Sequence, residues 1–184
     1  MELQNVPFTE ARAREMVNVS AGFRKMLKNK KAPLQDHIRI STIFLVVLSV
    51  ILVVILAVGI INRSIFFLIC SGIYMMLIFI YARSVVAMHK GIKMYMDLGS
   101  SGKRRTVLEE DGVTLEVEGS TTTKFLWESF KWVRIYKFNI LCVAKNDQFR
   151  DCLSLPIEHL DDLKGFLAEH NIELEIIEGE AYGK

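Results

Sequence analysis

The chain has 184 residues, 51% of them hydrophobic, and its 23 basic and 21 acidic residues leave a formal net charge of +2. That charge indicates little by itself, and we expect no nucleic-acid partner. The mean hydropathy of +0.28 is high for a soluble protein of this length. The excess lies in residues 40–82, where Arg63 is the one formal charge.

An N-terminal arm, residues 1–39, precedes this apolar region. Thr9 is a residue type that caps helices, and the sequence favours a helix from Glu10 to about Lys28. Its apolar residues recur on one side at helical spacing: Met16, Val19, Phe23, Met26 and Leu27. Such a basic amphipathic helix either lies on anionic headgroups, packs on the protein's own soluble domain, or serves only as a charge cluster that directs topology.

The apolar region contains two segments long enough to cross a bilayer. Residues 40–61 are about 22 residues without a charge, and a helix of that length spans roughly 33 Å, more than a hydrocarbon core of about 30 Å. Residues 65–82 are a second run of about 18 residues. Strands would need turn signals inside these runs, so we predict a transmembrane α-hairpin over residues 40–83. Because no signal-peptide pattern precedes it, we expect the hairpin to be retained.

Basic residues flank the two segments and are scarce between them. The connection holds Arg63 alone, whereas the flanks carry Lys25, Lys28, Lys30, Lys31, Arg39, Arg83, Lys90 and Lys93. By the positive-inside rule, the N- and C-termini are cytoplasmic and the turn at Asn62 lies outside. We therefore predict a multi-pass protein of the cell (inner) membrane.

Residues 84–102 are predicted to be a connector, helical to about residue 97 and broken by the Gly99-Ser100-Ser101-Gly102 sequence. From residue 103 the apolar period becomes strand-like. Turn residues divide the sequence into a meander of about six strands, over residues 105–110, 113–117, 121–127, 130–138, 140–145 and 148–155. An amphipathic helix follows through Leu160, Leu163, Phe166 and Leu167, with Asn171 at its C-terminal cap.

The predicted fold is thus a membrane α-hairpin plus a small α+β domain over residues 103–178. In this domain, a bent antiparallel sheet is capped by a C-terminal helix. Residues 179–184 are predicted to be a tail. Two adjacent spans, then KRRTVLEEDGVTLEVEG, FLWESFKWV and LPIEHLDDLKGFLAEH, resemble the YcxB-like family of bacterial membrane proteins. The resemblance covers roughly Thr9 to Asn171. It implies a pleckstrin-homology-like C-terminal domain and this topology, but no biochemical activity.

No pattern in the sequence indicates catalysis. The four histidines and three cysteines (His37, His89, His159, His170, Cys70, Cys142 and Cys152) lack metal-ligand spacing. Nucleophile-elbow, phosphate-loop and dinucleotide signatures are absent. The acidic residues 109–111 suit a solvated hairpin end. We expect a protein that is not an enzyme, with no catalytic residue, cofactor or metal.

The basic triplet Lys103, Arg104 and Arg105 is the candidate binding site. At the start of a sheet held close to the inner leaflet, it could contact anionic lipid; alternatively, it is a solvated strand end. Overall, the sequence favours a protein- or lipid-interaction module held at the lipid bilayer, with a membrane-protein partner or a homo-oligomer. The alternatives are an accessory subunit of a larger membrane complex, in transport or envelope stress, and an enzyme whose site forms only in an oligomer.

Overall fold

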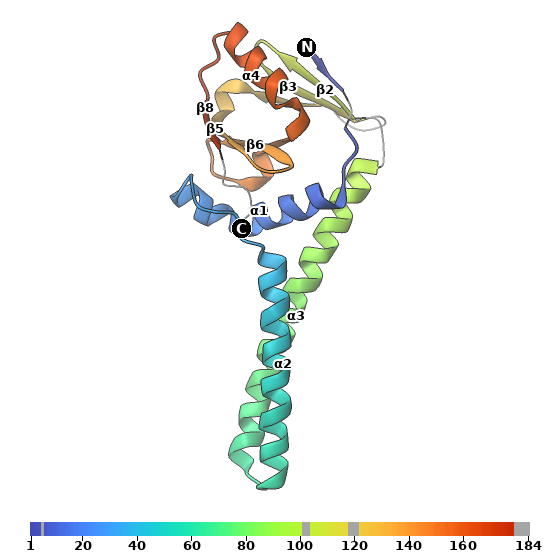
Figure 1. Ribbon diagram of the computed structural model, residues 1–184, viewed down its shortest axis with the longest axis vertical. Coiled ribbons are helices and arrows are strands. Elements are labelled where there is room, and N and C mark those ends of the chain that lie inside the picture. The colour runs from blue at the N-terminus through green and yellow to red at the C-terminus, as the bar shows by residue number, and fades with distance from the viewer. Residues whose placement is uncertain (5, 101–103, 118–121, 179–184) are drawn as a thin grey trace. The chain divides into compact units, whose positions relative to one another are not determined.

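The computed structural model describes residues 1–4, 6–100, 104–117 and 122–178 (Figure 1). The chain divides into two compact units. One unit is Asp36–Gly91, and the other combines Met1–Gln35 with Ile92–Lys184. The N-terminal arm therefore belongs to the same unit as the sheet region, although the hairpin separates the two in the sequence.

The first unit is a hairpin of α2 (His37–Ile61) and the beginning of α3 (Ile65–Ser100). The Asp36 carboxylate caps α2 by accepting a hydrogen bond from the Arg39 backbone N–H at 3.1 Å. At the turn, the Asn62 side chain donates to the Val58 carbonyl at 3.0 Å, and Arg63 adopts a left-handed φ of 47°. Both helices are long and apolar enough to cross a membrane, as predicted.

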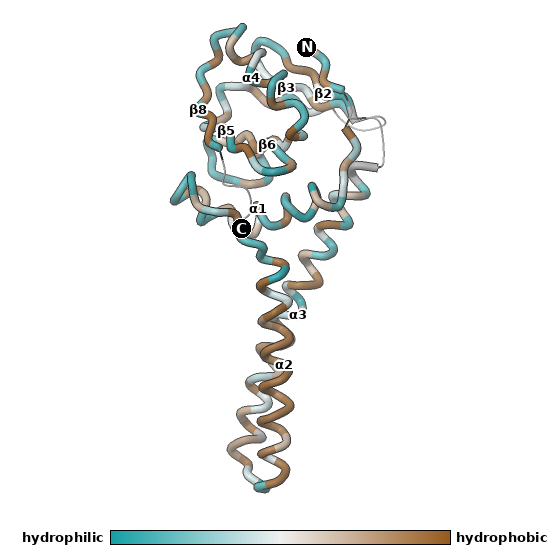
Figure 2. The backbone as a smooth tube through the Cα atoms, in the orientation of Figure 1, coloured by the Kyte–Doolittle hydropathy of each residue, from teal (hydrophilic) through white to brown (hydrophobic). Residues whose placement is uncertain are grey.

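The apolar side chains of the hairpin are mostly exposed, and Figure 2 shows hydrophobic residues along both helices. Among the small residues, Gly59 and Ser71 are buried, whereas Ser49 and Gly72 are exposed. The hairpin by itself therefore buries few of its residues.

α3 continues well past the predicted end of the second span. It includes Gly99 and Ser100, so the predicted helix break is wrong at these two positions; residues 101 and 102 lie outside the described chain. A glycine costs a helix only about 1 kcal/mol relative to alanine, which the preceding turns offset.

In the second unit, α1 (Glu10–Lys28) has the predicted bounds, and the Thr9 hydroxyl accepts a hydrogen bond from the Arg12 backbone N–H at 3.4 Å. The apolar side of α1 packs against Trp132, Tyr136 and Leu141, and it contributes Met16, Val19, Phe23, Met26 and Leu27 to this cluster. Of the alternatives open for this helix, packing on the protein's own sheet is the one that the structure has. These side chains are therefore not available to headgroups.

The sheet region contains two four-stranded sheets rather than one six-stranded meander. The first has the order β1-β2-β3-β4 and consists of Glu2–Leu3, Arg104–Glu109, Gly112–Val117 and Thr123–Leu126. The second has the order β7-β6-β5-β8, where β5 is Phe130–Ile135, β6 is Asn139–Ala144, β7 is Leu153–Pro156 and β8 is Glu175–Glu178. β8 pairs parallel with β5, and the other pairs are antiparallel. The sequence analysis missed β1 and β8, because such short strands show no alternation.

The described residues of the unit also form α4 (Leu160–Glu169) and three short 3-10 helices, which are η1 (Trp127–Ser129), η2 (Phe149–Asp151) and η3 (Ile157–His159). One core cluster joins side chains from both sheets and α4, including Val133 and Leu163, and the other lies under α1 and includes Trp132. Since the second sheet is covered on both faces, every residue of β6 is buried.

Candidate binding groove

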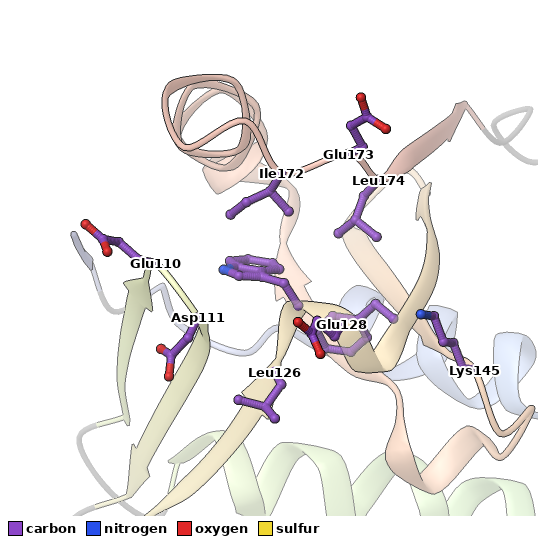
Figure 3. A pocket seen from close by; sticks show the side chains of 10 residues that line it. Glu110, Asp111, Leu126, Glu128, Lys145, Ile172, Glu173 and Leu174 are labelled. Carbon is purple, nitrogen blue, oxygen red and sulfur yellow. The ribbon is translucent and has the colours of Figure 1, made fainter.

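A groove with a volume of about 500 Å³ opens beside the end of β4 (Figure 3). One side is formed by the β2–β3 turn, β4 and η1, and the other by the segment that joins α4 to β8. Its lining residues are Glu110, Asp111, Leu126, Trp127, Glu128, Phe130, Lys145, Ile172, Glu173 and Leu174.

Trp127 forms a rigid part of the groove's surface, with 5% of the residue exposed. Its indole N–H donates to the Glu109 carbonyl at 2.8 Å, and its backbone N–H donates to the Asp111 carbonyl at 3.1 Å. Its ring centroid lies 6.2 Å from those of Phe130 and Phe166. With its polar atom already bonded, the indole presents an apolar surface in one orientation.

The opposite wall depends on how α4 ends. Asn171 adopts a left-handed φ of 52°, its N–H donates to the Ala168 carbonyl at 3.3 Å, and the Ile172 N–H donates to the Leu167 carbonyl at 2.9 Å. This pair of bonds is a Schellman motif, so the cap predicted at Asn171 is confirmed. The chain then runs extended, and Figure 3 shows Ile172 and Leu174 pointing into the groove and Glu173 pointing away from it.

The β2–β3 turn depends on Gly112 and Lys124. A Cβ on Gly112 would lie 2.2 Å from the Phe125 carbonyl oxygen, so only glycine allows β3 and β4 to pair this closely here. The Lys124 ammonium lies 2.8 Å from a carboxylate oxygen of both Glu109 and Asp111. Hydrogen bonds from Lys124 lower the pKa of both carboxyls, and they raise the pKa of Lys124.

The charge of the groove's rim is mainly negative. Within the part of the chain that the structure describes, no ion pair includes Glu110, Glu128 or Glu173. No ion pair in that part includes Lys145 either. Asp111 is already paired with Lys124. Three carboxylates and one ammonium without an ion-pair partner therefore belong to residues that line the groove, and the Glu173 carboxylate is directed away from its apolar surface.

A second hollow of about 430 Å³ continues along β4. It shares Leu126 and Lys145 with the first, and its other lining residues are Lys124, Phe125, Ser129, Ala144, Asn146 and Asp151. β4 is at the edge of its sheet, because β3 is its one strand neighbour in the described chain. The two hollows thus follow an edge strand.

Arg105 of the predicted basic triplet does not line this groove. Lys103 lies outside the described residues, and Arg104 begins β2. The Arg105 guanidinium lies 2.9 Å from a Glu2 carboxylate oxygen and 3.7 Å from one of Glu116. The hydrogen bond to Glu2 raises the pKa of Arg105. Its charge is therefore balanced within the first sheet, by a strand that the sequence did not reveal.

A buried polar cluster joins α1 to the β5–β6 turn, and the sequence analysis missed it. Glu15, fully buried, accepts hydrogen bonds from the backbone N–H groups of Lys137 at 3.1 Å and Phe138 at 3.0 Å, and from the Asn139 side chain at 2.8 Å. Burial raises the pKa of the Glu15 carboxyl. The Asn139 amide also donates to the Arg12 carbonyl at 3.2 Å. This cluster positions the arm and is structural.

Both ring nitrogens of His159 have partners within the protein. His159, which is buried, shares a hydrogen bond of 2.9 Å with the Gln4 carbonyl and lies 3.5 Å from the Asp162 carboxylate. Within the described part of the chain, no three His, Cys, Asp or Glu side chains are grouped as they would be to hold a metal ion.

Comparisons with known proteins give little. No family model matches the chain. No curated protein matches it either. A solved structure described as "Structure of the Spt16D Pob3N heterodimer" is similar with a TM-score of 0.34 and 14% identity, over 46% of this chain and 54% of that chain. This chain spans about half of that chain's length, and the likeness is too low to define a shared fold.

Proposed function

We propose that this protein is a membrane-anchored interaction module. In this proposal, α2 and α3 cross the membrane, both termini are cytoplasmic, and the sheet unit binds a partner at the inner leaflet. The observation that carries the proposal is the exposed apolar surface of the hairpin.

That surface is extensive. In the most hydrophobic window of each helix, 6% of the residues are buried. Val53 is 66% exposed, Ile65 75% and Phe79 62%. The core helix of a soluble protein buries such side chains, and a surface of this kind in water would aggregate, whereas hydrocarbon accommodates it.

The charges at the ends of the hairpin support the orientation. Arg39 lies at the start of α2, and Arg83 and Lys90 lie in α3 after the apolar run, whereas Arg63 is alone at the turn. The cluster of basic residues belongs on the cytoplasmic side.

For the sheet unit we propose a pleckstrin-homology-like fold, as the resemblance to the YcxB-like family implies. Two four-stranded sheets that share a core with α4 support this reading. We propose binding rather than catalysis, because the open hollows of the unit are lined by apolar and unpaired carboxylate side chains that suit contact with a partner.

An accessory subunit that packs through its membrane helices is the second candidate. Gly72 on α3 favours it, because this residue is exposed and nothing lies within 4 Å of where its Cβ would be. A small residue on an outer helix face lets another helix approach closely.

Cysteine labelling tests the proposed topology. In a chain whose three cysteines are replaced by alanine, Asn62→Cys should react with a membrane-impermeant thiol reagent on intact cells. The matched control Asp161→Cys, exposed on α4, should react only after lysis. The opposite pattern, or release of the protein from membranes by alkaline carbonate without detergent, would overturn the proposal.

A further inference from the structure

We propose that the groove along β4 binds an extended segment of a partner protein in which a large apolar side chain has Lys or Arg residues beside it. This inference rests on the proposed interaction function and names the class of its partner.

The lining of the groove determines the chemistry. Leu126, Ile172 and Leu174 line the groove together with Trp127, and this apolar surface suits one large apolar side chain. Beside this surface, the carboxylates of Glu110 and Glu128 take part in no ion pair within the described chain. A cationic group beside the apolar anchor would complement them, whereas an anionic headgroup would be repelled.

The edge of β4 favours a peptide over a small molecule. No strand that the structure describes pairs with the outer backbone groups of β4. The second hollow continues along the same strand. An extended segment can pair with such an edge while alternate side chains enter the hollows. The exposed side chain of Leu126, 48% exposed, lies where the two hollows meet.

The rim also predicts a direction for the charges. Lys145 lies on the far side of the groove from Glu110 and Asp111 (Figure 3). Basic residues of the partner segment should therefore lie on the side of its apolar anchor that is nearer Glu110, and acidic or neutral residues on the side nearer Lys145.

Selection from a random peptide library tests the proposal. The full chain, in nanodiscs of zwitterionic lipid, is used to select from 12-residue peptides displayed on phage. We expect enrichment of peptides that carry a large apolar residue with Lys or Arg beside it, mostly on one side. Absence of enrichment, or enrichment of acidic peptides, would overturn the proposal.

Charge reversal locates the binding. Binding of a selected synthetic peptide should weaken at least about tenfold in Glu110→Lys/Glu128→Lys. The control Glu158→Lys/Asp161→Lys changes the net charge equally at exposed positions outside the groove and should stay within about twofold. Equal loss in both variants would mean non-specific attraction and would contradict the proposal.

Two measurements identify other occupants. Quenching of Trp127 by lipid with brominated acyl chains, absent in Trp127→Phe, would assign the groove to lipid. A dimer that becomes a monomer in Glu110→Lys/Glu128→Lys would assign it to a second copy. Either result overturns the proposal. Neither result depends on the carbonate extraction and cysteine labelling that test the proposed function. Failure of this inference is therefore distinguishable from failure of the proposed function.

Discussion

The Glu15 carboxylate in α1 accepts a hydrogen bond from the Asn139 side chain at the start of β6, at 2.8 Å, across 124 positions of sequence. The same carboxylate bonds the backbone N–H groups of Lys137 and Phe138. The hairpin lies between these partners in the sequence, so this contact joins the parts of the sheet unit that precede and follow the hairpin.

Glu15→Ala should destabilise the sheet unit by about 2–4 kcal/mol, because it removes the acceptor of one buried and two part-buried hydrogen bonds. The measurement is denaturant unfolding of the full chain in detergent micelles, followed by tryptophan fluorescence. Both tryptophans, Trp127 and Trp132, lie in the sheet unit. Arg24→Ala, at an exposed position of the same helix, is the control and should change stability by less than about 0.5 kcal/mol. A loss no larger than that of the control would show that the contact does not hold α1.

The pH dependence of stability should reflect the raised pKa of Glu15. Burial raises that pKa above its ordinary value of 4.5, so the folded state binds the proton more tightly than the unfolded chain. The Glu15 contribution is therefore fully present below 4.5 and is lost as pH rises through the folded-state pKa. Relative to Glu15→Gln, the wild type should lose stability as the pH rises from 4.5 through the folded-state pKa of Glu15. A relative gain in the same unfolding measurements would contradict the assignment.

Gly112→Ala should destabilise the sheet unit by about 2 kcal/mol or more. The new Cβ would lie 2.2 Å from the backbone oxygen of Phe125, so β3 and β4 would have to move apart. Gly165→Ala on α4 is a matched control. Nothing lies within 4 Å of its Cβ position, so it should be neutral or stabilise by up to about 1 kcal/mol. Thermal unfolding of the two variants decides, and similar effects in both would refute the close approach at Gly112.

Cys142 should be inert to alkylation in the folded protein. It is fully buried, and burial raises the pKa of its thiol to about 12. Iodoacetamide treatment at pH 8 followed by peptide mass spectrometry should leave Cys142 unmodified in detergent micelles and modify it after unfolding in guanidinium. Rapid modification of the folded chain would mean that β6 is accessible, contrary to its burial on both faces.

Local sequence patterns predicted the elements that depend on local physics. The apolar runs before and after Asn62 predicted two long helices, Thr9 predicted the start of α1, and Asn171 predicted the cap of α4, because length, capping and turn chemistry act over a few residues. The turn after β2 was visible for the same reason, although its two loop residues are Glu110 and Asp111 and Gly112 already pairs with Glu109.

Pairing over long sequence separations was not visible in this way. Glu2–Leu3 and Glu175–Glu178 become strands only because β2 and β5 offer them partners, and the buried position of Glu15 depends on a turn more than a hundred residues away. The basic triplet stood out in the sequence, but Arg105 is balanced by Glu2, which only tertiary pairing brings to it.

The sequence by itself determined where the apolar helices run and where the strand-rich region begins, since hydrophobic period and length are properties of neighbouring residues. Only the tertiary structure decided that the arm completes the sheet unit and that Trp127, Ile172 and three carboxylates meet around one groove. The physical reason is that such contacts depend on long-range strand pairing and packing, which residues distant in sequence determine together.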